Sequence, residues 1–142
     1  EGAQLQRDVA AKLEQVSHLV DRIDEAAPQV VKAYRTRLRE RLRELLEGTS
    51  LTEERFLAEV ALFADKAAID EELVRLRSHL RQFARAMEAG EPVGRKLDFL
   101  LQEMNREVNT IGAKANSIEI ANAVVDIKTM LEKIREQIQN IE

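Results

Sequence analysis

The segment from residue 94 to residue 111 carries a row of polar side chains along one side of an expected helix. At about 100° per residue, four of them fall within an arc of roughly 60° beside the apolar positions. They are Asp98, Gln102, Asn105 and Asn109. Amides contribute less to helix formation and solubility than Lys or Glu, but they donate and accept hydrogen bonds. The row is therefore typical of a surface that binds a partner, with a solvated face of ordinary ion pairs as the alternative.

The neighbouring arc of the same segment holds Glu103, Arg106 and Glu107. The two carboxylates are one turn apart, so both could bind a divalent ion through oxygen, while the arginine could neutralise a phosphate. Phe99 lies on the side away from the apolar stripe. An aromatic ring at that position indicates contact with another subunit or domain.

A second group of reactive side chains comes from the preceding helical segment. Glu72 and His79 are seven residues apart, about two turns, and Arg75 lies on a nearby line. A carboxylate and an imidazole on one face could hold a divalent ion or share a proton. A surface pair or an interhelical hydrogen bond is the commoner explanation for this spacing, and His18 has no converging neighbours in the sequence.

Arginines recur at four-residue steps in two rows, which could each follow the phosphates of a nucleic acid or pair with nearby Glu. The rows are Arg35, Arg39 and Arg43, and Arg77, Arg81 and Arg85. The net charge of -4 argues against a protein that coats nucleic acid over its whole surface. With no Trp and a single Tyr, the chain also lacks the aromatic platform of the common single-strand binders.

Several enzyme classes lack their minimum parts. The chain has no Cys, which excludes disulfides, iron–sulfur clusters and cysteine-built zinc sites. It also has no GxxxxGK[ST], GxGxxG, GxSxG or HExxH motif. The remaining carboxylates, amides, histidine and arginines fit divalent-metal chemistry, with Mg²⁺ or Mn²⁺, on a phosphodiester.

Helices must position these groups, because the composition is rich in Ala, Leu, Glu and Arg, with only 5 Gly and 2 Pro in 142 residues. We expect an all-α protein: a long N-terminal αα-hairpin (helices over 3–25 and 28–46) followed by about four helices in a bundle. The predicted division is 1–50 for the hairpin or arm and 51–142 for a C-terminal helical domain. No apolar run approaches the roughly 20 residues that span a bilayer, so we expect a cytoplasmic protein without a membrane partner. The start at Glu1, without Met, indicates a fragment of a longer protein.

Three stretches resemble one known family. Residues 90–116, GEPVGRKLDFLLQEMNREVNTIGAKAN, closely resemble the signature of the YicC-like family, and 67–80 (AAIDEELVRLRSHL) and 133–142 (KIREQIQNIE) resemble its other two blocks. The resemblance extends over nearly the whole chain and falls on the C-terminal half of such proteins. It implies a bacterial endoribonuclease that depends on a divalent metal and works as a ring-like homo-oligomer, a hexamer. Ala113 and Ala115 flank Lys114 where members of the family often carry Ser, so a hydroxyl contribution there is in doubt.

The resemblance directs attention to the polar residues of these blocks, and Arg81 and Glu119 just outside them are further candidates; we assign their roles from their chemistry. The candidate catalytic residues are Glu103, Arg106, Glu107 and His79. The candidate RNA-binding residues are Arg75, Gln102, Asn105, Asn109, Lys114, Arg77 and Arg81. The candidate metal ligands are Glu103, Glu107, Glu72, His79, Asp98 and Glu119. The alternative is a helical oligomerisation or RNA-binding module whose catalytic groups need an N-terminal domain that this chain lacks.

Overall fold

The computed structural model describes residues 2–48, 52–67, 69–89, 94–115 and 117–140, and within these ranges every regular element is a helix. The helices are α1 (Gly2–Leu46), α2 (Glu53–Ala67), α3 (Asp70–Glu88), α4 (Gly94–Lys114) and α5 (Ile118–Gln139). The all-α prediction is confirmed, as are the four helices that follow the first 50 residues. The division into 1–50 and 51–142 stays a prediction.

No helix among the described residues is long and apolar enough to cross a membrane.

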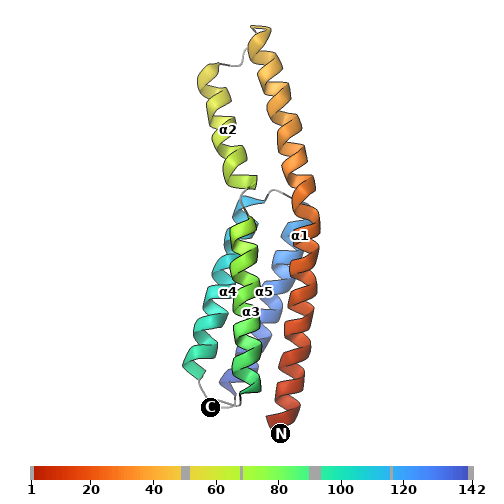
Figure 1. The fold of residues 1–142 in the computed structure, drawn as a ribbon, viewed down its shortest axis with the longest axis vertical. Coiled ribbons are helices and arrows are strands. Elements are labelled where there is room, and N and C mark those ends of the chain that lie inside the picture. Colours follow the sequence, from red (N-terminus) through yellow and green to blue (C-terminus); the bar gives the residue numbers. More distant parts are fainter. Residues whose placement is uncertain (1, 49–51, 68, 90–93, 116, 141–142) are drawn as a thin grey trace.

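The first half of α1 packs with α3, α4 and α5 into an antiparallel four-helix bundle (Figure 1). Each helix turns one apolar stripe inward, because its apolar residues recur at three- and four-residue steps. The fully buried side chains include Val16, Val20, Ile23, Leu76, Phe83, Met104, Ile111, Ile120, Ile127 and Ile134. This core fixes the order α1, α3, α4, α5 around the bundle, so α3 and α4 lie side by side.

Residues 2–46 form one helix, and the turn predicted between residues 25 and 28 is wrong. Pro28 lies inside α1. An internal proline removes one backbone hydrogen bond, to the carbonyl of Asp24, and costs about 3 kcal/mol. The apolar stripe nevertheless continues through it without a change of phase, with Ile23, Ala27 and Val30 all buried. Pro28 itself is exposed, so water can hydrogen bond to the Asp24 carbonyl that it leaves unpaired.

A two-helix arm extends beyond the bundle, and it consists of residues 31–46 of α1 with α2 (Figure 1). The Tyr34 and Phe63 rings meet edge to face, with centroids 6.4 Å apart, but no described residue of the arm is fully buried. Several large apolar side chains of the arm are exposed: Leu42, Leu46, Leu57, Val60 and Leu62. This arm pairs the second half of α1 with α2, whereas the sequence predicted an arm made of the first 50 residues alone.

Helix α4 continues past Gly112, where the sequence predicted a break. A Cβ at Gly112 would lie 3.3 Å from Cγ1 of Val124, so glycine here allows α4 and α5 to approach closely. The helix ends two residues later, at Lys114. The extra turn places Lys114 on the helix, from which its side chain reaches α3.

Candidate active site between α3 and α4

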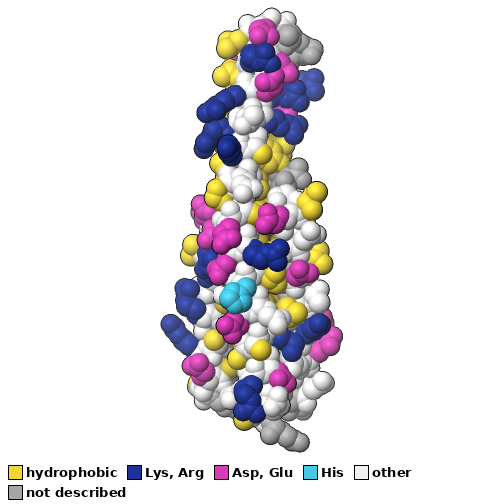
Figure 2. Space-filling view, turned by 90° about the vertical axis from the view of Figure 1, so that its right-hand side faces the viewer, with side chains coloured by type: hydrophobic (Ala, Val, Ile, Leu, Met, Phe, Trp, Pro, Cys, Tyr) yellow, Lys and Arg dark blue, Asp and Glu magenta, His cyan; other side chains and the backbone are white. Residues whose placement is uncertain are grey.

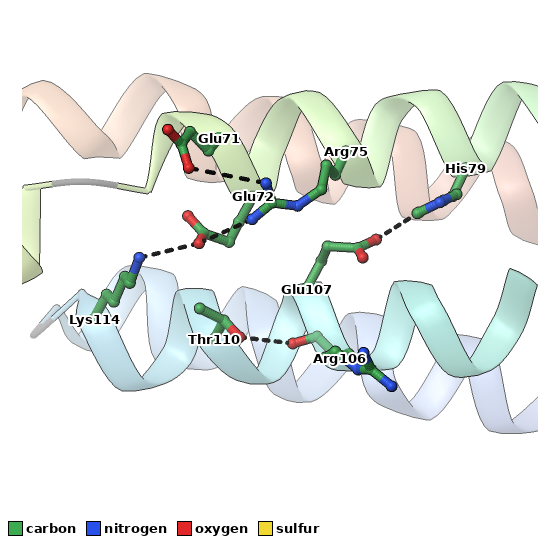
Figure 3. Close-up of polar contacts among 8 residues, drawn as sticks. All are labelled: Glu71, Glu72, Arg75, His79, Arg106, Glu107, Thr110 and Lys114. Carbon is green, nitrogen blue, oxygen red and sulfur yellow. Dashed lines mark hydrogen bonds and ion pairs between the residues drawn. The ribbon is translucent and has the colours of Figure 1, made fainter.

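The facing edges of α3 and α4 carry charged side chains that meet across the helix pair (Figure 3). On α3, Glu72, Arg75 and His79 follow one another at steps of three and four residues, so they share one edge. On α4, Glu107 and Lys114 are seven residues apart and share the edge that faces them. Because the two helices are antiparallel, Lys114 lies opposite Glu72 and Glu107 lies opposite His79.

His79 and Glu107 form the first pair. Nδ1 of His79 lies 2.8 Å from Oε1 of Glu107, and the Glu107 side chain is only 5% exposed. The imidazole is 18% exposed, so it lies between the carboxylate and solvent. In the part of the chain that the structure describes, Nε2 of His79 has no hydrogen-bond partner. A carboxylate therefore holds one ring nitrogen while the other remains available to a ligand.

Glu72 and two cations form the second cluster. Oε1 of Glu72 accepts from Nζ of Lys114 at 3.0 Å and from Arg75 at 3.2 Å. The Glu72 side chain is 5% exposed, and its Oε2 is buried without a hydrogen-bond partner among the described residues. A buried carboxylate needs such cations, because an unpaired buried charge is costly. Arg75, half exposed, also lies 3.8 Å from Glu71.

The six predicted metal ligands do not meet at one place. Asp98 accepts a hydrogen bond from Gln102 and lies 3.7 Å from Arg135 of α5. Glu103 pairs with Arg106 at 3.4 Å, and Glu119 is exposed in the first turn of α5. Within the described ranges, no three His, Cys, Asp or Glu side chains come close enough to hold a metal ion. Lys114 and Arg75 already neutralise Glu72, so these residues do not by themselves fit a metal centre.

The polar row of α4 lies on the outer surface of the bundle. Gln102, Asn105 and Asn109 are all exposed and line a shallow hollow along α4 that ends at Lys114. Gln102 and Asn105 also border the groove toward Lys128 and Arg135 of α5. Both a partner-binding surface and a solvated face would be exposed in this way, so the binding role of the row stays a prediction. Phe99, elsewhere on α4, is 57% exposed, as the sequence predicted. The Arg106 side chain extends away from α3 (Figure 3).

Arg77 and Arg81 lie outside the α3–α4 edge. Arg77 donates to Asp21 at 2.7 Å and to Asp24 at 3.0 Å, which ties α3 to α1. The hydrogen bond that Arg77 donates to Asp21, with a smaller contribution from its bond to Asp24, raises the pKa of Arg77 against the opposing effect of burial. Arg81 is exposed beside a groove between α1 and α3. Arg77 is therefore already bound to two carboxylates, which argues against its predicted role in RNA binding.

Sequence reasoning grouped Glu72, His79 and Glu107 as shared metal ligands, and it did not predict the direct His79–Glu107 and Glu72–Lys114 pairs across the helices. A signal for burial was present, because Glu107 follows Leu100 and Met104 on the core stripe at steps of four and three residues. Glu72 follows Ile69 by three residues on the stripe of α3 in the same way. A carboxylate at a core position requires a partner from a neighbouring helix.

A comparison with known families finds one that matches most of the chain. A family model described as "Endoribonuclease YicC-like, C-terminal" matches residues 23–142. The chain belongs to this YicC-like C-terminal family. Proteins named "Probable endoribonuclease YicC" are similar to it: one from Clostridioides difficile (strain 630) is 48% identical over 143 residues, and one from Haemophilus influenzae is 34% identical over 142. Each match covers 100% of this chain and 49% of the relative, so the chain spans about half the length of these curated relatives.

Proposed function

We propose that this chain is the C-terminal half of an endoribonuclease and that its α3–α4 edge supplies groups for cleavage of an RNA phosphodiester bond. The observation that carries the proposal is the 2.8 Å pair of His79 and Glu107, a partly open imidazole on a buried carboxylate. The names of the relatives support RNA as the substrate class. We keep a divalent ion, Mg²⁺ or Mn²⁺, as a proposal for the full-length protein, and no step below depends on it.

His79 is the proposed general acid and base. An imidazole can take a proton from an attacking hydroxyl and return one to the leaving oxygen. Glu107 fixes the orientation of the ring through Nδ1 and stabilises its positively charged form, which leaves Nε2 to face the substrate. Glu107 is thus a positioning residue in this proposal, since its carboxylate contacts the imidazole and lies below the surface.

The cations beside the pair are the proposed phosphate contacts. Lys114 is about one-third exposed and Arg75 about half exposed, so both can reach a phosphate while they stay near Glu72. Positive groups held in place before the reaction stabilise the charge that develops on the phosphate oxygens. The exposed amides of Gln102, Asn105 and Asn109 then border the path of the strand along α4.

The test is cleavage of a labelled structured RNA by the full-length protein in Mn²⁺, Mg²⁺ or EDTA. We expect His79→Gln to lower the rate by about 10²- to 10⁴-fold, the usual contribution of a general acid or base. Glu107→Gln should lower it less, because the amide can still bond to the ring. Glu103→Gln is the matched control: the same change on the same helix, one turn away, at a carboxylate paired only with Arg106 among the described residues.

Circular dichroism and thermal unfolding of each variant separate loss of chemistry from loss of folding. Normal cleavage by a folded His79→Gln protein would remove the pair from the active site. Loss of activity in Glu103→Gln, with His79→Gln active, would instead move the site to the outer face of α4.

A second candidate is an assembly or RNA-binding module that leaves catalysis to the other half of the protein. The exposed apolar side chains favour it, above all Leu46, Ile118 and Val125, which are 78%, 83% and 61% exposed. We propose that the full-length protein is a homo-oligomer, a hexamer, which light scattering would measure. RNA binding without cleavage by this chain, together with cleavage by a full-length His79→Gln protein, would favour this candidate.

A further inference from the structure

The arm carries a row of exposed cations that the proposed site does not use. Lys32, Arg35 and Arg39 are all exposed on α1. At about 100° per residue, they lie roughly 100° to 160° around the helix from Tyr34, whose ring packs on α2. Figure 2, viewed from the α1 side, shows Lys and Arg side chains gathered over the arm. The row therefore faces away from the seam between the two helices of the arm.

The other arginines of the arm's part of α1, residues 31–46, are neutralised by carboxylates. Arg37 lies 3.6 Å from Glu59 of α2, Arg41 lies 3.2 Å from Glu44, and Arg43 pairs with Glu40. No ion pair joins Lys32, Arg35 or Arg39 to any described residue.

The local sequence explains the difference. Three or four residues from each member of the row, the helix offers Pro28, Gln29, Val31, Thr36, Leu38, Leu42 or another cation, and no carboxylate. Like charges at such spacing repel by a few tenths of a kcal/mol per pair. The row therefore costs the isolated arm some stability, and an external anion would reverse this cost.

We propose that Lys32, Arg35 and Arg39 bind the sugar–phosphate backbone of the RNA substrate, outside the candidate active site. The choice of RNA rests on the proposed function. Successive members are about 4.5 and 6 Å apart along the helix axis at a rise of 1.5 Å per residue, so their long side chains can contact neighbouring phosphates of one strand. Besides Arg35, the exposed side chains between Lys32 and Arg39 are Ala33, Thr36 and Arg37, so this stretch lacks the large apolar anchors that a protein partner requires.

The position of the row sets a length requirement on the RNA. Arg77 of α3 donates a hydrogen bond to Asp24 of α1, so these two residues lie at the same height along the bundle axis. Arg35 lies eleven residues beyond Asp24, or about 16 Å along the axis. His79 lies two residues further from the arm than Arg77, so an RNA of a few nucleotides centred on His79 does not extend to the row, whereas a strand of about 20 nucleotides does.

The experiment compares two variants of the full-length protein that each remove two charges from the same helix. Arg35→Gln/Arg39→Gln removes unpaired cations, and Arg37→Gln/Arg43→Gln removes paired ones. Affinity for a 20-nucleotide single-stranded RNA is measured from 50 to 300 mM KCl, with a gel to confirm that the RNA stays intact. We expect the first variant to bind about tenfold more weakly at low salt and to lower the slope of log K against log salt by about 1.4, the value for two single-strand phosphate contacts. The control should keep the wild-type slope.

Equal weakening in both variants would overturn the proposal, because it would reflect net charge alone. An unchanged slope in Arg35→Gln/Arg39→Gln would also overturn it, and would favour a protein partner for the row. Cleavage of a four-nucleotide RNA gives an independent check, since the first variant should cut it normally; a matching loss there would indicate a damaged site. If the full-length protein cuts no RNA, the proposed function fails, while the binding slopes still decide whether the row contacts RNA.

Discussion

Two buried carboxylates determine what the α3–α4 edge can do. Glu72 and Glu107 are each 4% exposed, in positions where the helix pattern would place leucine or isoleucine. Each is neutralised from the opposite helix, Glu72 by Lys114 and Glu107 by His79 when the ring is protonated. An apolar pair would hold the two helices as well or better, because desolvation offsets much of the Coulomb gain of a buried ion pair.

Stability measurements can test this view of Glu72. Lys114→Met leaves Glu72 buried with only the half-exposed Arg75, so we expect it to lower the free energy of unfolding by about 1–3 kcal/mol. Glu72→Met/Lys114→Met removes both charges and should recover most of that loss. Urea unfolding of the two variants measures both values. A double variant less stable than Lys114→Met would mean that the pair itself stabilises the bundle.

The sequence predicted which residues of α3 share an edge better than it predicted which residues of α4 they contact. Spacing within one helix placed Glu72, Arg75 and His79 on one edge, because the helical repeat fixes relative directions. The partners depend on how far α4 is shifted along α3, and packing of the whole core sets that shift. A displacement of one turn would bring His79 toward Glu103, so the choice of Glu107 was not readable from the sequence. Metal ligands were the weakest prediction, since they require several helices to converge at one point.

At the scale of helices, Pro28 shows that a continuous apolar stripe outweighs a local helix breaker. The prediction of a hairpin relied on proline as a helix start, although Ile23, Ala27 and Val30 kept their spacing across it. The type of every element and most boundaries could be predicted, because periodicity specifies them. The continuation through Gly112 could not, since it depends on how closely Val124 of α5 approaches.

Replacement of the proline gives a direct check of this helix. Pro28→Ala restores a backbone donor for the Asp24 carbonyl and removes the ring, so we expect it to stabilise the protein by up to about 3 kcal/mol. Thermal unfolding, followed by circular dichroism at 222 nm, measures the change. Gln29→Ala, at the adjacent exposed position, is the control and should alter the midpoint little. A lower midpoint for Pro28→Ala would show that the native path of α1 needs the proline.

At the scale of the whole molecule, the bundle and the arm differ in how much apolar surface they bury. The bundle contains nearly all of the buried apolar residues. The last buried residue of α1 is Val30, and no described side chain of α2 is buried. Hydrophobic burial supplies most of the stability of a helix in a protein. The arm should therefore open locally at a lower free energy than the bundle.

Hydrogen exchange measures this difference. We expect backbone amides of residues 34–46 and 57–67 to exchange at least tenfold faster than those of residues 100–111 and 123–134, because opening of the arm exposes less apolar surface. Peptide-level mass spectrometry resolves these segments. Addition of a 20-nucleotide RNA should slow exchange in residues 34–46 if the cation row binds it. Equal protection in the arm and the bundle of the free protein would show that another part of the protein covers the arm.

The uninterrupted α1 also gives the molecule a mechanical property. A helix of 45 residues is a rod of about 68 Å, anchored along one half in the bundle and free of the core along the other. Because no loop separates the two halves, a force applied at the tip of the arm acts on the interface between α1 and α3. At this interface Arg77 donates hydrogen bonds to Asp21 and Asp24. The backbone hydrogen bond that Pro28 removes lies where α1 leaves the bundle, so the helix bends most easily at that point. Tension on a strand held by the arm would thus load the helix that carries His79.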